Sequence, residues 1–313
     1  MVVQLRKFAY GIGLLQSHRI TAPVIVVGNI TVGGTGKTPL VIALVQHLKQ
    51  QGWRPGVISR GYGGTSSFWP RIITQGDSAG EVGDESLLIY QRTGVPVVAG
   101  PERVRSAHML VEKFHCNVLI SDDGFQHYAL QRDIDIVVID GKRGAGNGWC
   151  LPSGPLREPV SGLRRADLQV INGQSASAAS SDHREREFAM QMVVGDLYQL
   201  ENHDIRLPLS TMTAKRVHAV AGLGNPERFF NTLTHGGLDI ERHVFDDHHH
   251  YQASNFSFAT DRDTVVMTEK DAVKCAGLLP PGVAWVLPVN AELTPLFYQS
   301  IDSQLANFVA EKK

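Results

Sequence analysis

Short apolar runs alternate with amphipathic segments along the first half of the chain, and this alternation constrains the fold more than any other feature. Strands are expected at residues 23–29, 54–64, 95–100, 117–124, 133–141 and 167–173, and helices at 36–52, 83–94 and 101–114. Strands that alternate with helices are typical of parallel α/β units, because a parallel pair needs a long crossover that a helix supplies. The sequence therefore predicts an α/β fold with a mostly parallel sheet and helices on both faces.

The composition changes at residues 173–187, "GQSASAASSDHRERE", which are small, polar and charged. Such a stretch predicts a linker or an exposed connection. Strand–turn–helix patterns resume at 216–237 and 264–277, and a final amphipathic helix is expected from Glu292 to Lys313. At 313 residues the chain is long enough for about two domains. The expected units are a core domain at 23–175 and a second, smaller α/β domain at 176–313.

The loop "GNITVGGTGKT" (28–38) is similar to a phosphate-binding P-loop, G-x-x-x-x-G-K-[ST], although Thr31 stands where the strict motif has glycine. A Val/Ile strand precedes the loop and a helix begins at the GKT, so loop amides could converge on a phosphate at a helix N-terminus. Lys37 would reach the β- and γ-phosphates, and the hydroxyl of Thr38 would bind Mg²⁺. A glycine-rich turn without nucleotide is the less favoured interpretation. The candidate cofactor-binding residues are Gly33, Gly34, Thr35, Gly36, Lys37 and Thr38.

An acidic pair, Asp122 and Asp123, ends the expected strand "NVLISDDG". Carboxylates at the C-terminal end of a buried strand suit Mg²⁺, directly or through water. A simple DDG turn is the alternative, but the separation from the GKT loop fits one parallel sheet. Thr38, Asp122 and Asp123 are therefore the candidate metal ligands of a P-loop NTPase-like core.

Other polar residues occupy positions where they could take part in phosphoryl transfer. Arg103 and Arg105 are two residues apart and do not share a helical face, although a loop-like helix start could bring both to one anion; a solvated helix end is the alternative. Asp84 starts an expected helix, as an N-cap or as a base. Arg157 and Glu158 lie in a Gly- and Pro-rich loop that we expect to be rigid.

The run "FDDHHHYQ" (245–252) contains His248, His249 and His250. Adjacent residues do not share one face of a regular element, and zinc ligands are usually spaced. A role as a proton partner is therefore favoured over a metal site, with at least one of the three exposed in a loop. The lone GxG in "VAGLGNPERF" lacks the third glycine of a dinucleotide fingerprint and predicts a tight strand-to-helix turn.

Charge and cysteine content exclude several classes of protein. The 30 basic and 31 acidic residues nearly cancel, which argues against broad nucleic-acid binding. Three distant cysteines, Cys116, Cys150 and Cys275, form neither a CxxC spacing nor an even disulfide set, and they fit a reducing cytoplasmic compartment. No apolar run reaches the ~18–20 residues that span a bilayer. No obligate protein partner is indicated.

The first 22 residues form a separate amphipathic segment, and its first 20 hold basic residues but no acid. Two interpretations remain open: a helix packed on the core domain, or an interfacial helix that lies on an anionic membrane. The apolar residues at roughly helical spacing are Val2, Leu5, Phe8, Ile12 and Leu15.

Taken together, the motifs resemble the tetraacyldisaccharide 4'-kinase family from about Pro23 to about Cys275. The motifs are "VGNITVGGTGKTP", "SRGYGG", "GDES", "SDDGFQH", "IDIVVIDG…GNGWCLPSGPLREP" and "VMTEKDAVKC". The resemblance implies a kinase that uses ATP and Mg²⁺ to phosphorylate the 4'-hydroxyl of tetraacyldisaccharide 1-phosphate in lipid A (lipopolysaccharide) biosynthesis. It also implies a peripheral protein on the cytoplasmic face of the bacterial inner membrane, held there by its N-terminal segment. Two α/β domains would enclose the active site in their cleft. The family itself uses the loop form with Thr31.

The resemblance also implies roles for individual residues. Asp84 would act as the base with a histidine after Asp247 as its partner; His248 matches, with His249 and His250 left open. Lys37 and Asp123 would complete the catalytic set. The expected substrate-binding residues are Arg103, Arg105, Gln126, His127, Arg157 and Glu158. A P-loop ATPase or GTPase that works as a switch or assembly factor is the rival interpretation, and it would not depend on an acceptor.

Overall fold

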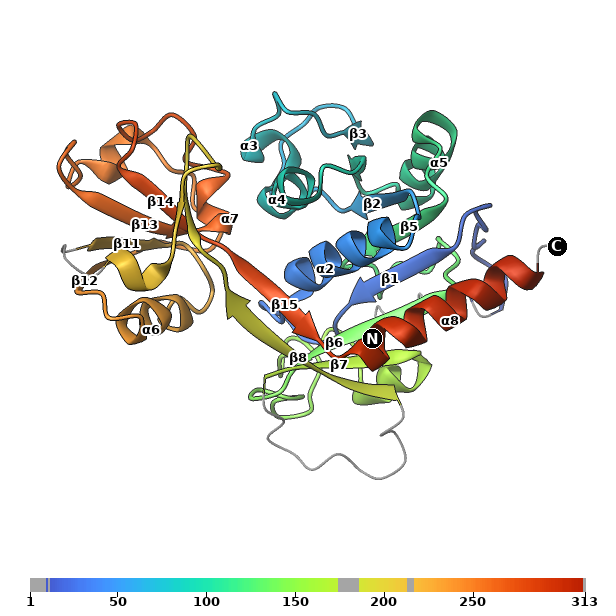
Figure 1. The fold of residues 1–313 in the computed structure, drawn as a ribbon. Helices are drawn as coiled ribbons and strands as arrows, with labels where there is room; N and C mark the ends of the chain where they lie inside the picture. Colours follow the sequence, from blue (N-terminus) through green and yellow to red (C-terminus); the bar gives the residue numbers. More distant parts are fainter. Residues whose placement is uncertain (1–9, 11, 174–185, 213–216, 312–313) are drawn as a thin grey trace.

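The computed structural model describes residues 10, 12–173, 186–212 and 217–311. These residues build two sheets (Figure 1). The first is nine-stranded, in the order β15-β8-β7-β6-β1-β5-β2-β4-β3. Its strands are β1 (Val24–Gly28), β2 (Pro55–Ser59), β3 (Arg71–Ile72), β4 (Val97–Ala99), β5 (Val118–Asp122), β6 (Ile134–Asp140), β7 (Leu168–Asn172), β8 (Glu187–Val194) and β15 (Val289–Leu293). Only the β3–β4 and β8–β15 pairs of this sheet are antiparallel.

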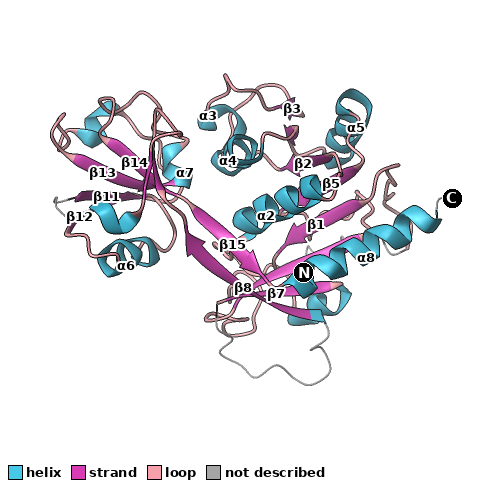
Figure 2. Cartoon of the chain, in the orientation of Figure 1, coloured by secondary structure: helices cyan, strands magenta, loops and turns pink. Residues whose placement is uncertain are grey.

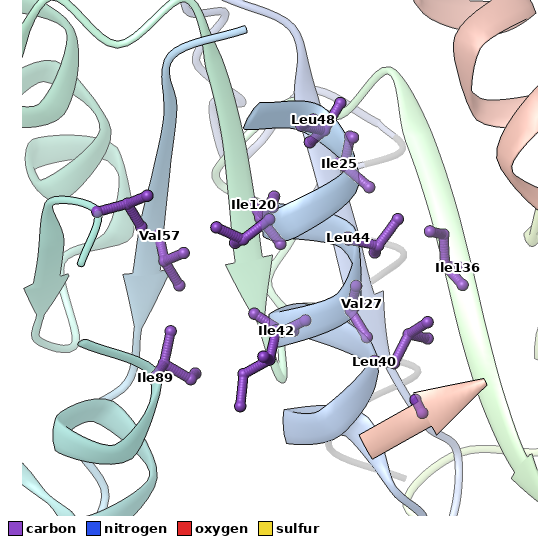
Figure 3. Close-up of a cluster of buried hydrophobic side chains, with 14 of the residues drawn as sticks. Ile25, Val27, Leu40, Ile42, Leu44, Leu48, Val57, Ile89, Ile120 and Ile136 are labelled. Atoms are coloured by element: carbon purple, nitrogen blue, oxygen red, sulfur yellow. The ribbon is translucent and has the colours of Figure 1, made fainter. Parts of the chain in front are cut away.

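The central strands of the first sheet are buried on both faces, which explains their continuous apolar sequences. Alternate residues of β1 face opposite ways, so Ile25 and Val27 join one core and Val24 and Val26 the other. Figure 3 shows the first of these cores, where Leu44 packs toward the sheet. The helices on this face are α2 (Lys37–Gln50), α3 (Ala79–Val82), α4 (Asp84–Thr93) and α8 (Pro295–Glu311), and α5 (Arg103–Phe114) packs on the other. The predicted α/β class with helices on both faces is confirmed.

The second sheet is six-stranded, in the order β10-β9-β14-β13-β11-β12. It is parallel across β14, β13, β11 and β12, with β9 and β10 added antiparallel. Helices and loops pack on its two faces (Figure 2). Its elements are β9 (Leu197–Gln199), β10 (Arg206–Leu207), β11 (Val217–Ala221), α6 (Glu227–His235), β12 (Ile240–Val244), β13 (Thr264–Thr268), α7 (Glu269–Ala272) and β14 (Ala284–Leu287).

Strand membership differs from the predicted division after residue 175. That division assigned all of 176–313 to the second domain, whereas β8, β15 and α8 belong to the first sheet and its core. The cause is that β8 extends the parallel sheet beside β7, while β15 pairs with β8 and leads into α8. Residues between β8 and β15 form the second sheet, and Figure 1 shows these two strands leading out to it and back.

Most of the N-terminal segment predicted at 1–22 lies outside the described residues. Of its described part, Ile12 and Leu14 are 59% and 76% exposed. Further along, the hydroxyl of Ser17 donates to Tyr128 O at 2.8 Å, which joins the segment to the first unit, the first sheet with the helices packed on it. The second unit is the second sheet with its helices and loops. Within the described part of the chain, no helix has both the length and the apolar character needed to cross a bilayer.

Candidate active site

The loop before α2 has the backbone of a phosphate-binding loop. Gly33 and Gly36 have φ angles of 90° and 96°, a region that residues with a side chain rarely adopt. The helix begins directly after Gly36, so Lys37 and Thr38 lie in its first turn. A helix N-terminus has unpaired N–H groups and the positive end of the dipole. The loop is therefore suited to an anion such as a phosphate.

Thr31, which replaces the first glycine of the strict motif, lies outside the left-handed turns of the loop. It is buried and forms a strand-like bridge with Leu156, beside a 2.9 Å hydrogen bond from Val32 N to Pro155 O. The left-handed conformations fall at Gly33 and Gly36 instead. Because position 31 needs no positive φ, threonine fits there without strain.

Neighbouring strands hold the loop in place. The amide nitrogen of Asn172, at the end of β7, donates to Thr35 O at 2.9 Å, and that of Asn29 donates to Thr35 Oγ1 at 3.2 Å. A methyl group at Gly36 would clash with Met192 and would lie 2.8 Å from the Asn172 side-chain nitrogen. These contacts fix the carbonyl that precedes Gly36, and they leave no room for a side chain at that residue.

Asp123 faces the lysine of the loop. Its Oδ1 lies 3.4 Å from Lys37 Nζ, and Arg157 Nη1 donates to its two carboxylate oxygens at 2.9 and 2.8 Å. Burial alone would raise the pKa of Asp123, but the charges of Lys37 and then Arg157 outweigh it and lower the pKa. Asp123 is therefore ionised at neutral pH and can align Lys37 electrostatically.

Asp122, the last residue of β5, is more deeply buried than Asp123. Burial, and then the charge of Asp123, raise its pKa to about 6. Within the described residues, its Oδ1 accepts no hydrogen bond. A buried carboxylate oxygen without a partner, at the strand end beside a P-loop, is the donor that a divalent cation requires. Asp122 thus suits a divalent cation such as Mg²⁺, and its roles together with Asp123 and the hydroxyl of Thr38 stay predictions.

The two arginines at the start of α5 lie in different surroundings. Arg103 is buried, and it donates to Ser121 Oγ at 2.6 Å and to the carbonyls of Asp122 and Asp123 at 2.5 and 3.0 Å. Burial lowers its pKa to about 10. Arg105 is exposed and lies 3.9 Å from Glu102. Arg103 therefore holds the end of β5 in position, whereas Arg105 points into solvent.

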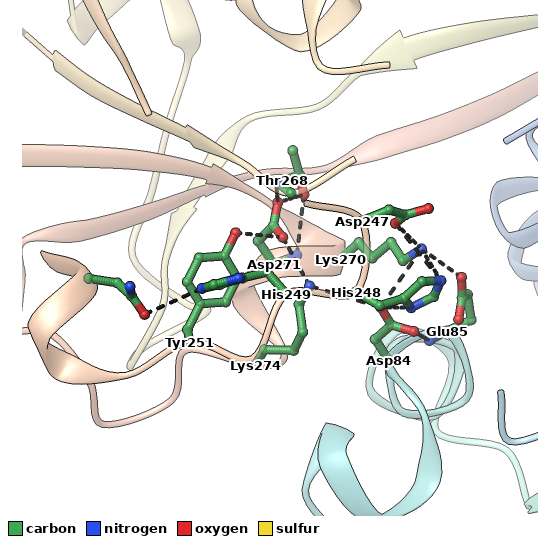
Figure 4. A network of polar contacts seen from close by, with 12 residues as sticks. Asp84, Glu85, Asp247, His248, His249, Tyr251, Thr268, Lys270, Asp271 and Lys274 are labelled. Atoms are coloured by element: carbon green, nitrogen blue, oxygen red, sulfur yellow. Dashed lines mark hydrogen bonds and ion pairs between the residues drawn. The ribbon is translucent and has the colours of Figure 1, made fainter. Parts of the chain in front are cut away.

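A second polar centre brings together residues of α4, of α7 and of the loop after β12 (Figure 4). Asp84, the buried first residue of α4, has its Oδ2 3.0 Å from His248 Nδ1. His248 comes from the loop after β12 and has a φ of 61°, and the Tyr62 ring contacts it edge-on at 5.1 Å. The pair therefore exists only because α4 of the first unit meets the β12 loop of the second.

The protonation of this centre is tuned by burial and by its neighbours. Burial is the largest cause that raises the pKa of Asp84. The hydrogen bond with Glu85 and the negative charge of Glu85 raise it further. Burial would also raise the pKa of Glu85, but the bond with Asp84 and the charge of Lys270 outweigh it and lower the pKa. Burial lowers the pKa of His248, and the positive charge of Lys270 lowers it further. The charge of Glu85 contributes to the raised pKa of Asp122, so the two halves of the site are electrostatically coupled.

Comparison with known proteins decides the family. The family model described as tetraacyldisaccharide-1-P 4'-kinase matches residues 1–306. The chain belongs to this family. The tetraacyldisaccharide 4'-kinases of Methylobacillus flagellatus and Nitrosococcus oceani are each 46% identical to it over 313 residues, covering 100% of this chain and 90% and 89% of theirs. The structure of LpxK from Aquifex aeolicus in complex with ATP matches with a TM-score of 0.82 at 29% identity, covering 97% of this chain and 95% of that one.

The family assignment confirms the predicted enzyme class, a phosphotransferase. Its relatives carry the name of a kinase, so the switch or assembly-factor interpretation is not favoured. In this kinase, the observed contacts also separate the three histidines that the sequence left open. His248 lies beside Asp84, whereas His249 packs against the rings of Phe245 and Tyr251 and His250 is exposed.

Lys270 is a member of the kinase site that sequence reasoning missed. Its ammonium lies 2.8 Å from Glu85 Oε1, 3.0 Å from Asp247 Oδ1 and 3.8 Å from Asp84 Oδ2. It also lies 3.4 Å from His248 Nε2. Those carboxylates raise the pKa of Lys270 despite its burial, so it stays charged. It therefore links α4 of the first unit to the second unit beside the Asp84–His248 pair.

Lys274, four residues after Lys270, also lies close to Asp84. Its Nζ lies 3.1 Å from Asp271 Oδ1 and 4.0 Å from Asp84 Oδ2. Asp271 is buried and accepts hydrogen bonds from Gly222 N, Tyr251 OH and Thr268 Oγ1. Lys270 lies in α7 and Lys274 in the turn after it, so no helical spacing in the sequence signals this pair.

Gln126 and Glu158, which were expected to bind substrate, are hydrogen-bonded to each other. Gln126 Nε2 donates to Asn29 O at 2.8 Å and to Glu158 Oε1 at 2.7 Å. Arg165 donates to both oxygens of buried Glu158, at 2.6 and 3.0 Å. These contacts brace the loop after β1. Next to them, His127 O accepts a 2.5 Å hydrogen bond from Arg132.

Proposed function

We propose that this chain transfers the γ-phosphate of ATP to the 4'-hydroxyl of a tetraacyldisaccharide 1-phosphate, in lipid A biosynthesis. The family assignment and the ATP-bound structural relative support the reaction. The single observation that carries the proposal is the Asp84–His248 contact of 3.0 Å, because a buried carboxylate held by an imidazole is suited to accept a hydroxyl proton.

The phosphate half of the site positions ATP. Amides around Gly33, Gly34 and Gly36 would hold the phosphates, and Lys37 would turn its charge from Asp123 toward the transferring group. Mg²⁺, when bound by Thr38, Asp122 and Asp123, supplies charge neutralisation at the phosphates. Asp122 must lose its proton to serve as a ligand, and because its pKa is raised to about 6, the carboxylate form prevails only above about pH 6.

The base half accepts the proton of the acceptor hydroxyl. Asp84 would take this proton, and His248 would fix the orientation of its carboxylate through the Nδ1–Oδ2 contact. Lys270 would hold Glu85 and Asp247 around the pair and keep both units together. Arg105 and Arg157 are proposed to meet the phosphates of the substrates, with Arg103, Gln126, His127 and Glu158 as supports of the site.

Acceptor dependence tests the function. ATP turnover by the purified chain should be slow with Mg²⁺ alone and should rise strongly when tetraacyldisaccharide 1-phosphate is added. The product should carry the new phosphate at the 4' position, which ³¹P NMR detects. Hydrolysis at the same rate with and without the disaccharide would contradict the kinase and favour a nucleotide-dependent switch.

Peripheral binding to the cytoplasmic face of the inner membrane is the proposed location. The exposed side chains of Ile12, Leu14 and Leu15 and the basic charge of the first 20 residues support it. We expect the full chain to float with anionic vesicles at low salt and to be released at high salt, because salt screens the attraction. A chain without residues 1–20 should stay in the bottom fraction. Equal flotation of both forms would exclude the segment as the anchor.

A further inference from the structure

A second cluster of ligand-type side chains lies on the second sheet, away from the kinase centre. His218 is on β11, and Glu241 and His243 are on the adjacent edge strand β12. In the parallel register His218 is directly opposite Glu241, and His243 follows two residues later. Residues two apart in a strand point to the same face, so all three side chains share one face of the sheet.

The three side chains converge on one point. His218 Nδ1 lies 3.0 Å from His243 Nε2 and 3.9 Å from Glu241 Oε2, and His243 Nε2 lies 4.0 Å from Glu241 Oε1. Donor atoms around a tetrahedral Zn²⁺, at about 2.0–2.2 Å from the metal, are roughly 3.3–3.5 Å apart. The observed separations bracket this value, so small side-chain adjustments bring all three to one cation.

The surroundings are those of a metal-binding histidine pair. Asp263 Oδ1 lies 3.9 Å from His218 Nε2, the nitrogen opposite the cluster, so a short movement would let this carboxylate accept a hydrogen bond from it. The Phe258 ring stacks on His243 at 3.6 Å and 10°, which fixes the ring plane.

The cluster is separate from the Asp84–His248 pair and is accessible to solvent. His218 and His243 precede the carboxyl ends of β11 and β12, whereas His248 and Lys270 follow the carboxyl ends of β12 and β13. The histidine side chains are 12% and 16% exposed, and that of Glu241 is 39% exposed. A cation can therefore enter from solvent and keep a water as its fourth ligand.

We propose that His218 Nδ1, His243 Nε2 and the Glu241 carboxylate form a Zn²⁺ site that ties the edge strand β12 to β11. The two imidazoles favour Zn²⁺ over Mg²⁺, and a carboxylate completes a His₂Glu ligand set of the kind that zinc sites use. The competing explanation is a plain hydrogen bond between two neutral imidazoles. That explanation predicts no metal uptake at this position.

Zinc titration of the full chain tests the site. Because Asp84, Glu85 and His248 form a second potential cluster, the titrations use the Asp84→Asn background without nucleotide. We expect one Zn²⁺ per chain by calorimetry and a rise in melting temperature, because the metal binds the folded state. His218→Gln and His243→Gln should each weaken affinity by at least about 10–100-fold. The matched control is His235→Gln, an exposed histidine on α6, which should bind as the background does.

Two further measurements keep the test decisive where a histidine variant folds poorly. Glu241→Gln changes a partly exposed side chain, and it should also weaken Zn²⁺ binding while the far-UV spectrum stays unchanged. In the unaltered chain, Zn²⁺ should shift the ¹⁵N resonances of His218 Nδ1 and His243 Nε2. No zinc uptake by the background, unchanged resonances, or affinity in these variants equal to that of His235→Gln would overturn the site.

Discussion

Replacing Lys37 by alanine is expected to abolish phosphoryl transfer, with a loss on the order of 10³-fold or more in kcat, as for other single cations at a transferring phosphate. The reason is that charge on the γ-phosphate is spread over its oxygens as it moves, and Lys37 is the cation at the start of α2. Single-turnover transfer from γ-labelled ATP to the disaccharide measures the loss directly.

Two companion variants separate charge from structure at Lys37. Lys37→Met keeps the side-chain stem and should lose as much activity as Lys37→Ala, with a similar melting temperature. Lys49→Ala, at the other end of α2, removes a lysine that donates to Thr93 O at 2.9 Å and should keep transfer near the wild-type rate. A Lys37→Ala enzyme at full rate would refute the P-loop assignment.

Replacing Asp84 by alanine should lower kcat by about 10²–10⁴-fold, because a positioned base is lost, while ATP binding persists. The pH profile carries the more specific prediction. Burial raises the pKa of Asp84, and the base works only when deprotonated, so wild-type kcat should rise with pH through a value above that of a free carboxyl. In Asp84→Ala this limb should disappear.

The control for Asp84 is an acid in the same position of another helix. Glu227 opens α6, is exposed, and pairs with Arg242 at 3.2 Å. Glu227→Gln should leave both kcat and the pH profile unchanged. Near wild-type turnover by Asp84→Ala, or an unchanged acid limb, would show that Asp84 is not the base.

The candidate phosphate-binding loop could be predicted from the sequence because its residues are consecutive in the chain. The GKT loop, the strand before it and the helix after it occupy consecutive residues, and the acidic pair ends a recognisable apolar strand. In the structure Lys37 lies 3.4 Å from Asp123, so these two segments do meet, while their phosphate- and metal-binding roles stay predictions. The Asp84–His248 pair is different, because 163 residues separate its members in the chain and only the family resemblance connected them. Their roles stay predictions.

The sequence could not predict contacts between segments that are far apart in the chain. Lys270 and Glu85 look like ordinary surface charges in isolation, and their 2.8 Å contact exists only where the two units touch. Likewise, His218 and His243 follow no spaced metal motif, since strand pairing alone aligns them. The polar run 173–187 indicated a domain boundary, yet β8, which begins at Glu187, continues the first sheet because it pairs in parallel with β7.

The pairing of β8 with β15 has a consequence for how the two units are joined. Val194 is opposite Val289, so for the first sheet the whole of residues 195–288 is the loop of one β-hairpin. The second unit is thus a guest, a domain inserted at the tip of this hairpin. The first unit is the host, and its last elements, β15 and α8, follow the insertion in the chain. Since the cost of closing a loop rises slowly with its length, such a tip can carry a complete folded unit. The guest then brings His248 and Lys270 to a site whose phosphate loop belongs wholly to the host.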